Sequence, residues 1–170
     1  MIRTVCLTAL LVSLFSMPAM AQSQTVFLLR HAEKSSEPAA DPELTDAGKA
    51  RAERLVSLFA QAKPSAVFST QYRRTVATAT PLAEAMALKV TVLPIDKDNA
   101  ERYPEILREA VCAMANGSNA VVIGHSNTLP AIVQAWTGKP ANAIDDTEYD
   151  RLFMVRLEKC EAIGSMDLRY

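Results

Sequence analysis

Apolar and polar residues follow one another in blocks along the chain, and these blocks predict strands and helices in turn. Short apolar runs rich in β-branched residues predict buried strands, whereas longer segments with apolar residues every three or four positions predict helices. The expected strands cover residues 25–30, 66–69, 90–93, 120–123, 152–157 and 162–168. The expected helices cover residues 45–62, 72–88, 101–116 and 128–136. This alternation predicts a single α/β domain with a mostly parallel sheet of about six strands and helices on both faces.

The ends of several helices are marked in the sequence. Thr45 is a good N-cap residue, because its hydroxyl can accept a hydrogen bond from the first turn of a helix. Pro64 is expected to stop that helix at about residue 62. Gly117 and Gly138 are expected to end two later helices, since glycine readily adopts the left-handed conformation that follows a helix. The apolar residues expected to face the core from the first two helices are Ala50, Leu55, Leu58, Phe59, Val76, Leu82, Ala83 and Met86.

Residues 1–21 have the features of an export signal that is removed from the mature protein. Arg3 precedes an apolar run over residues 5–15, and residues 19–21 (AMA) form the small-x-small pattern of a cleavage site. A bilayer span needs about 20 apolar residues, so this run is too short to serve as an anchor. We therefore expect a periplasmic or secreted catalytic domain of residues 22–170 with no stable membrane anchor.

Composition excludes several classes of function. The 18 Lys and Arg residues against 19 Asp and Glu residues give a net charge of −1, which argues against a nucleic-acid binder. Two histidines are too few for a multi-histidine metal centre, and the chain has no Walker loop. Neither Cys112 nor Cys160 has an arginine six residues later, as a thiolate phosphatase would require. In an oxidising compartment these two cysteines could form a disulfide or remain two separate buried thiols.

Both histidines and two arginines are expected at one edge of the sheet. Arg30 and His31 end the first strand, His125 follows the fourth strand, and Arg74 lies near the start of the helix after the second strand. Ligands of such sheets bind at the carboxyl ends of the strands. Arginine matches the oxygens of a phosphoryl group bidentately, and a neutral histidine can attack phosphorus. This set of residues therefore predicts a phosphoryl-binding pocket that needs no metal ion.

Four motifs around these residues resemble the histidine phosphatase superfamily, which is related to the cofactor-dependent phosphoglycerate mutases. Residues 28–34 (LLRHAEK) resemble the RHxE signature, and residues 44–52 (LTDAGKARA) are similar to the LTxxGxxRA helix. Residues 70–79 (TQYRRTVATA) resemble the S-x-x-x-R-x-x-x-T-A segment with Thr in the Ser position, and residues 124–130 (GHSNTLP) match GHSNTxP. The motifs occur in the family's order, so the resemblance implies a phosphoglycerate mutase-like fold for nearly the whole mature chain.

The resemblance also implies a role for each pocket residue. His31 corresponds to the nucleophile that accepts the phosphoryl group, and His125 to the histidine that stabilises the transferring oxygens. Arg30 and Arg74 correspond to the residues that clamp the phosphate. The residues expected to complete substrate binding are Glu33, the acidic residue of RHxE, and Asn127.

Two positions of the third motif can be aligned in more than one way. Arg73 is adjacent to Arg74 and could take its place, although Arg74 preserves the four-residue step to the Thr-Ala pair of the motif. Ser69 could likewise be aligned in place of Thr70.

The group that would protonate the leaving oxygen has several candidates. Mutase-like members of the superfamily use a carboxylate located after the third strand, where this chain has Asp96, Asp98 and Glu101 outside any motif. Water could deliver the proton instead. Ser126 stands where the acid phosphatase and phytase branch has an acid, which separates this chain from that branch. A further acidic run is expected to be a solvated loop and consists of Asp145, Asp146, Glu148 and Asp150.

The expected function is an exported phosphomonoester hydrolase that acts on a small phosphorylated substrate through a phosphohistidine, without a metal or other cofactor. The alternative is a phosphate-ligand binding module of the same fold with little or no turnover. A mutase of central metabolism or a phosphohistidine-protein phosphatase would conflict with the export signal, because the substrates of both are cytosolic.

Overall fold

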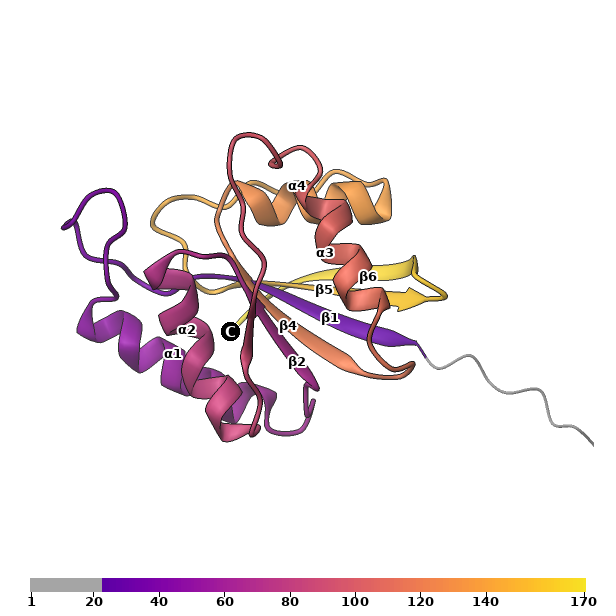
Figure 1. The fold of residues 1–170 in the computed structure, drawn as a ribbon, viewed down its shortest axis with the longest axis horizontal. Coiled ribbons are helices and arrows are strands. Elements are labelled where there is room, and N and C mark those ends of the chain that lie inside the picture. Colours follow the sequence, from indigo (N-terminus) through magenta and orange to yellow (C-terminus); the bar gives the residue numbers. More distant parts are fainter. Residues whose placement is uncertain (1–22) are drawn as a thin grey trace, which may run out of the picture.

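The computed structural model describes residues 23–170 and contains one six-stranded sheet with four helices (Figure 1). The predicted export signal lies outside the described residues. The strands are β1 (Gln24–Arg30), β2 (Ala66–Ser69), β3 (Val90–Val92), β4 (Asn119–Gly124), β5 (Arg151–Glu158) and β6 (Glu161–Arg169). The helices are α1 (Asp46–Phe59), α2 (Arg73–Ala85), α3 (Tyr103–Cys112) and α4 (Thr128–Thr137). The predicted α/β fold is confirmed.

The strands are arranged in the order β3-β2-β4-β1-β5-β6. The first four are parallel, whereas β5 and β6 are antiparallel to their neighbours, so the sheet is mostly parallel as expected. Arg30 of β1 lies opposite Gly124 of β4, and Ser69 of β2 lies opposite Ile123. The residues that follow these strands therefore emerge next to one another at the carboxyl edge of the sheet.

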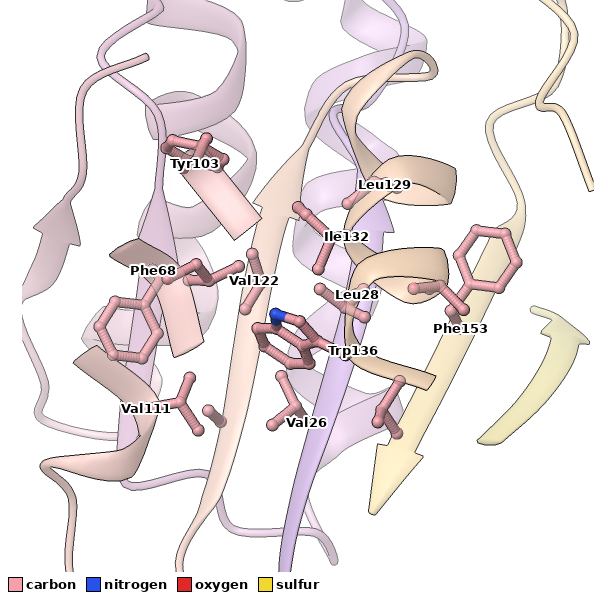
Figure 2. Close-up of a cluster of buried hydrophobic side chains, with 14 of the residues drawn as sticks. Val26, Leu28, Phe68, Tyr103, Val111, Val122, Leu129, Ile132, Trp136 and Phe153 are labelled. Carbon is pink, nitrogen blue, oxygen red and sulfur yellow. The ribbon is translucent and has the colours of Figure 1, made fainter. Parts of the chain in front are cut away.

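Helices cover both faces of the sheet, as predicted. Helices α1 and α2 pack on one face over a cluster that includes Leu29, Val121 and Ile123, and α3 and α4 pack on the other. Figure 2 shows the second cluster, where Trp136 of α4 packs near Val26 of β1. Successive side chains of a strand point to opposite faces, so strands covered on both sides are apolar at almost every position.

Two of the predicted helix ends are confirmed and two are wrong. The Thr45 hydroxyl accepts a hydrogen bond from the N–H of Gly48 at 3.1 Å and caps α1, and Gly138 ends α4 with a φ of +69°. Helix α1 ends at Phe59, before the expected stop, because the chain turns away over residues 60–63. Helix α3 ends at Cys112, so Gly117 lies in the loop before β4, where its φ is +79°.

Four residues expected in the core are not fully buried there. Ala50 is exposed, Leu58 is 41% exposed, and Val76 and Met86 are only half-buried. The buried positions of α1 are Gly48, Ala52, Leu55 and Phe59, which follow the spacing of a single helical face. Gly48 sets this face, because an added Cβ would lie 2.2 Å from the carbonyl oxygen of Glu33. The backbone after β1 therefore packs directly on α1, which the apolar pattern alone does not reveal.

The two cysteines of the described chain form a disulfide. Cys112 at the end of α3 is bonded to Cys160 in the turn between β5 and β6, and their Cα atoms are 5.7 Å apart. The bond joins segments separated by 48 residues. The structure thereby decides between the two states that the sequence left open.

None of the helices within residues 23–170 is both long enough and apolar enough to cross a membrane.

Candidate active site

The two histidines and Arg74 lie together at the carboxyl edge of the sheet. The ring centroids of His31 and His125 are 5.5 Å apart, and Nη2 of Arg74 is 3.4 Å from Nδ1 of His125. Arg30 and His31 are 3% exposed, and His125 is 7% exposed. The structure thus places these four predicted site residues around one buried region.

His31 is held in a single tautomer by the backbone. Its Nδ1 atom is 2.8 Å from the carbonyl oxygen of Ala32, which can only accept a hydrogen bond, so Nδ1 carries the proton. The lone pair is therefore on Nε2. Burial lowers the pKa of His31 to about 4, and the charges of Arg30 and Arg74 also lower it, although the Ala32 bond opposes this shift. His31 is neutral at pH 7, as a nucleophile must be.

His125 has the other tautomer, with its proton on Nε2. Nδ1 faces Arg74, which can only donate, so this nitrogen holds the lone pair and Nε2 holds the proton. Nε2 is 2.9 Å from the hydroxyl oxygen of Thr70. Burial lowers the pKa of His125 to about 3, and the charges of Arg74, His31 and Arg30 lower it further. Both histidines are therefore neutral at physiological pH.

Arg30 is held by the loop that contains the acidic run. Its Nη1 atom donates to the carbonyl oxygens of Asp145, Asp146 and Glu148 at 2.8, 3.0 and 3.0 Å. The guanidinium carbon is 4.3 Å from the centre of the Tyr149 ring. The expectation of a merely solvated loop is therefore wrong, because the backbone of this loop binds a pocket arginine.

The side chains of this acidic run are not all solvated either. Asp146 is 95% exposed, but Glu148 is only 13% exposed and accepts from Nε of Arg151 at 2.6 Å. Glu148 also pairs with Arg169 of β6. These ion pairs attach the loop to the sheet. The acidic run in the sequence did not indicate this attachment.

Arg74 is the arginine of the pocket, and Arg73 is not. The side chain of Arg74 is 15% exposed, and its guanidinium lies 4.4 Å from the Tyr72 ring centre and 3.6 Å from the Asp41 carboxylate. The side chain of Arg73 is 55% exposed and pairs with Glu43 outside the pocket. The alignment that favoured Arg74 agrees with this arrangement. Asp41 is a pocket neighbour that the sequence reasoning missed, since it belongs to no motif.

Two arginine nitrogens in this region lack partners within the described chain. The Nε atoms of Arg30 and Arg74 are buried, yet neither makes a hydrogen bond to any residue in the range 23–170. Buried donors without partners are costly, so such groups indicate a ligand with acceptor oxygens. A phosphoryl group supplies those oxygens.

Two threonines of the third motif hold the pocket together. Thr70, not Ser69, contacts His125, since the Ser69 hydroxyl donates to the Thr70 carbonyl at 2.8 Å. The Thr78 hydroxyl accepts from the N–H of Ala32 at 3.0 Å and donates to the Arg74 carbonyl at 2.7 Å. Helix α2 is thereby bonded to the segment that follows the nucleophile. The motif contains both threonines, but only the structure shows what they bind.

Glu33 is bound by an arginine. Its carboxylate accepts from Nε and Nη2 of Arg51 at 2.7 to 3.0 Å, and these hydrogen bonds are the main cause of the lowered pKa of Glu33. The pair attaches the loop after His31 to α1. Contact between Glu33 and substrate stays a prediction, and the contact that the structure describes is with Arg51.

A cavity of 310 Å³ opens beside His125 and provides room for the rest of a phosphorylated ligand. Its lining includes Tyr72, Arg74, Asp96 and the predicted binding residue Asn127. The Asp96 carboxylate accepts from two N–H groups of its own turn, at 2.9 and 3.0 Å. A larger cavity of 780 Å³ between α1 and α2 is lined by neither histidine, so we assign the site to the smaller one.

The other two candidates for the general acid lie elsewhere. The side chain of Asp98 is 82% exposed, and Glu101 lines a separate cavity of 260 Å³ that also contains Asn127. Asp96 is thus the one predicted acid that lines the cavity beside His125. Within residues 23–170, no three His, Cys, Asp or Glu side chains are grouped closely enough to hold a metal ion.

One family model matches the N-terminal part of the described chain. Residues 26–95 match the model of the histidine phosphatase superfamily (branch 1). This segment contains the first three of the four motifs, so this part of the chain is similar to that superfamily. The match and the two histidines and two arginines at the carboxyl edge of the sheet support a phosphatase. A comparison with curated proteins found no match.

Solved structures of superfamily phosphatases share the fold. A mycobacterial glucosyl-3-phosphoglycerate phosphatase is 15% identical with a TM-score of 0.67, and the match covers 88% of this chain and 99% of that one. The protein histidine phosphatase SixA, complexed with tungstate, is 17% identical with a TM-score of 0.64, covering 85% and 96% of the two chains. At these identities the likeness shows the fold alone.

Proposed function

We propose that this protein is an exported phosphomonoester hydrolase that acts through a phosphohistidine at His31 and requires no metal ion. The observation that carries the proposal is the state of His31. Its Nδ1–H is bound by the Ala32 carbonyl, so the lone pair is on Nε2, and its ring centroid lies 5.5 Å from that of His125, with the charges of Arg30 and Arg74 nearby. This is the arrangement that a nitrogen nucleophile for phosphorus requires.

The reaction has two displacements. In the first, the Nε2 lone pair of His31 forms a bond to phosphorus while the bond from phosphorus to the ester oxygen breaks, and the leaving oxygen takes a proton to become an alcohol. In the second, water attacks phosphorus and gives one proton to the group that supplied the proton in the first step, while the bond from nitrogen to phosphorus breaks, so that inorganic phosphate is released and neutral His31 is restored. Arg30 and Arg74 bind the phosphoryl oxygens, whose negative charge is spread over three atoms in the transition state.

Two carboxylates lie where they could serve the leaving oxygen. Asp96 lines the cavity beside His125, and Asp41 pairs with Arg74. The variants Asp96→Asn and Asp41→Asn show which of the two is the proton donor. Loss of the residue that protonates the leaving oxygen should lower the rate strongly for an alkyl phosphate and much less for an aryl phosphate, whose leaving group is stable as an anion.

Separate features support a small substrate and a location outside the cytoplasm. A cavity of 310 Å³ suits a small phosphorylated compound. One superfamily neighbour is named for a small phosphorylated substrate and has also been solved with inorganic phosphate. Residues 1–21 carry the signal pattern, and the disulfide between Cys112 and Cys160 supports export because such bonds persist in oxidising compartments.

The decisive experiment traps the intermediate. The mature chain is mixed with a 32P-labelled phosphomonoester and quenched in alkali, which preserves phosphohistidine. Label should be retained by the native chain and by an Arg73→Gln control, and lost in His31→Gln. Turnover by His31→Gln at the native rate would refute the proposal, and so would loss of native activity in chelator. Tight phosphate binding without turnover would identify the binding module instead.

A separate experiment tests export. The full-length gene product is recovered from the producing cells, and its N-terminus is determined by mass spectrometry. A mature chain that begins at Gln22 and is found outside the cytoplasm supports the proposal, whereas retention of residues 1–21 in the cytoplasm contradicts it.

A further inference from the structure

A row of buried hydroxyl groups leads from His125 into the protein. The Thr70 hydroxyl oxygen is 2.9 Å from Nε2 of His125 and 2.8 Å from the hydroxyl oxygen of Thr75. The Thr75 hydroxyl is in turn 2.8 Å from the carbonyl oxygen of Tyr72. Both threonines are completely buried. Because water does not reach them, their hydrogen bonds are set by one another and by the histidine.

The direction of each hydrogen bond follows from the ends of this row. Arg74 donates to Nδ1 of His125, so Nε2 carries the ring proton and donates to Thr70. Thr70 then donates to Thr75, and Thr75 donates to the Tyr72 carbonyl, which can only accept. Every donor in the row has an acceptor in the structure as described.

The same arrangement conflicts with the role proposed for His125 in the reaction. A histidine that stabilises phosphoryl oxygens must present an N–H to them. Nε2 is bound by the buried Thr70, and the nitrogen on the side of Arg74 is Nδ1, which has no proton in this tautomer. When Arg74 turns to bind phosphate, a bare Nδ1 would face negatively charged oxygens and repel them.

We propose that Thr70 is a positioning residue that lets His125 exchange tautomers. Its hydroxyl accepts from Nε2–H when the pocket is empty and donates to Nε2 when a phosphoryl group is bound, so that Nδ1–H then faces the transferring oxygens. The proton that leaves Nε2 passes to water in the cavity that His125 lines, and water or the bound phosphate supplies the proton that Nδ1 gains, so the charge of the ring does not change. This inference rests on the proposed function of His125.

A hydroxyl is the group that permits both states. A carboxylate or carbonyl at this place could only accept, and would hold the proton on Nε2 of His125. A backbone N–H could only donate. Thr75 accommodates both states, because its hydroxyl can donate to the Tyr72 carbonyl in either one. Thr70 thus differs from a residue that merely packs against the ring.

Nitrogen NMR tests the exchange directly. The chain has two histidines, so 15N-histidine labelling of the untagged protein gives four ring nitrogens, and a protonated nitrogen differs widely in shift from a bare one. At pH 7, His125 should carry its proton on Nε2 without phosphate and on Nδ1 with saturating inorganic phosphate. The same tautomer in both conditions, or two protonated nitrogens with phosphate, would overturn the proposal.

Variants test the part played by Thr70. Thr70→Val has nearly the same shape without the hydroxyl, and should abolish the phosphate-dependent change in tautomer and lower kcat about tenfold, the value of one hydrogen bond, with KM within about twofold. Thr70→Ser should restore both properties. The matched control is Thr80→Val in α2, whose hydroxyl donates to the Val76 carbonyl and which should behave as the native chain.

The outcomes separate this inference from the proposed function. If the native chain turns over no phosphomonoester, the proposed function fails, and the NMR of His125 with inorganic phosphate still decides the tautomer. If turnover is normal and Thr70→Val matches the native chain in kcat and in tautomer, the inference on Thr70 fails alone. If circular dichroism shows that Thr70→Val does not fold, the 15N NMR spectra of the native chain and of Thr70→Ser still show whether His125 changes tautomer with phosphate.

Discussion

Arg74 and Arg73 are adjacent in sequence and are expected to respond in opposite ways to the same substitution. In the structure, Nη2 of Arg74 faces His125 and its buried Nε has no partner within residues 23–170, so two of its donors are available for a phosphoryl group. Hydrogen bonds to charged groups contribute about 1.5–3 kcal/mol each. Loss of two such bonds corresponds to about 3–6 kcal/mol, or a decrease in kcat/KM of roughly 10²- to 10⁴-fold.

The same change at Arg73 should have almost no effect. Its side chain is 55% exposed and pairs with the exposed Glu43, and an exposed ion pair contributes only about 0–1 kcal/mol. Neither variant should unfold the protein, because Asp41, the partner left behind by Arg74, is 37% exposed and can be solvated.

The assay measures kcat/KM of Arg74→Gln and Arg73→Gln with p-nitrophenyl phosphate, together with melting temperatures. Arg74→Gln should lose at least a hundredfold, and Arg73→Gln should stay within about twofold of the native value. Equal losses, or a larger loss for Arg73→Gln in a folded protein, would refute the assignment of the phosphate clamp.

Three further predictions concern pH and stability. Because burial lowers the pKa of His31 to about 4, its NMR titration should have a midpoint near 4, and a midpoint near 6.5 would contradict the buried geometry. The unfolded chain binds this proton near pH 6.5, so the free energy of unfolding should fall as pH decreases from about 6.5 to about 4. Replacing Cys112 and Cys160 with Ala opens a 48-residue loop and should lower the free energy of unfolding by about 4 kcal/mol in urea titrations, whereas an unchanged midpoint would show that the bond adds no stability. Gly48→Ala should cost about 1–3 kcal/mol in the same titrations, because its Cβ would overlap the Glu33 carbonyl, and a neutral result would mean that α1 moves freely there.

Much of the fold could be predicted from local patterns. A strand buried on both faces must be apolar at nearly every position, which is why 66–69 was predicted with the bounds of β2. The N-cap at Thr45 and the glycine after α4 were predicted because each depends on backbone geometry within a few residues. The core-facing side of α1 was predicted only in part: Leu55 and Phe59 are buried, but Ala50 and Leu58 are not, since this side depends on the close approach of α1 to the backbone at Glu33.

The candidate site was likewise predicted in part from the sequence. Motif order and the rule for parallel sheets predicted that His31, His125, Arg30 and Arg74 share one region, because parallel strands bring their carboxyl ends to one edge. The sequence alone therefore determined these four residues of the site and the chemistry that they favour, but not neighbours such as Asp41. It did not determine which nitrogen of each histidine carries a proton.

The tertiary structure decided those finer properties, because each depends on partners that are remote in sequence. The tautomer of His125 depends on Arg74, 51 residues away, and Arg30 is held by the carbonyl of Asp145, 115 residues away. The disulfide and the ion pair of Glu33 with Arg51 likewise join separate elements. A hydrogen bond requires two atoms within about 3 Å, and only the packed sheet and helices bring such distant segments that close.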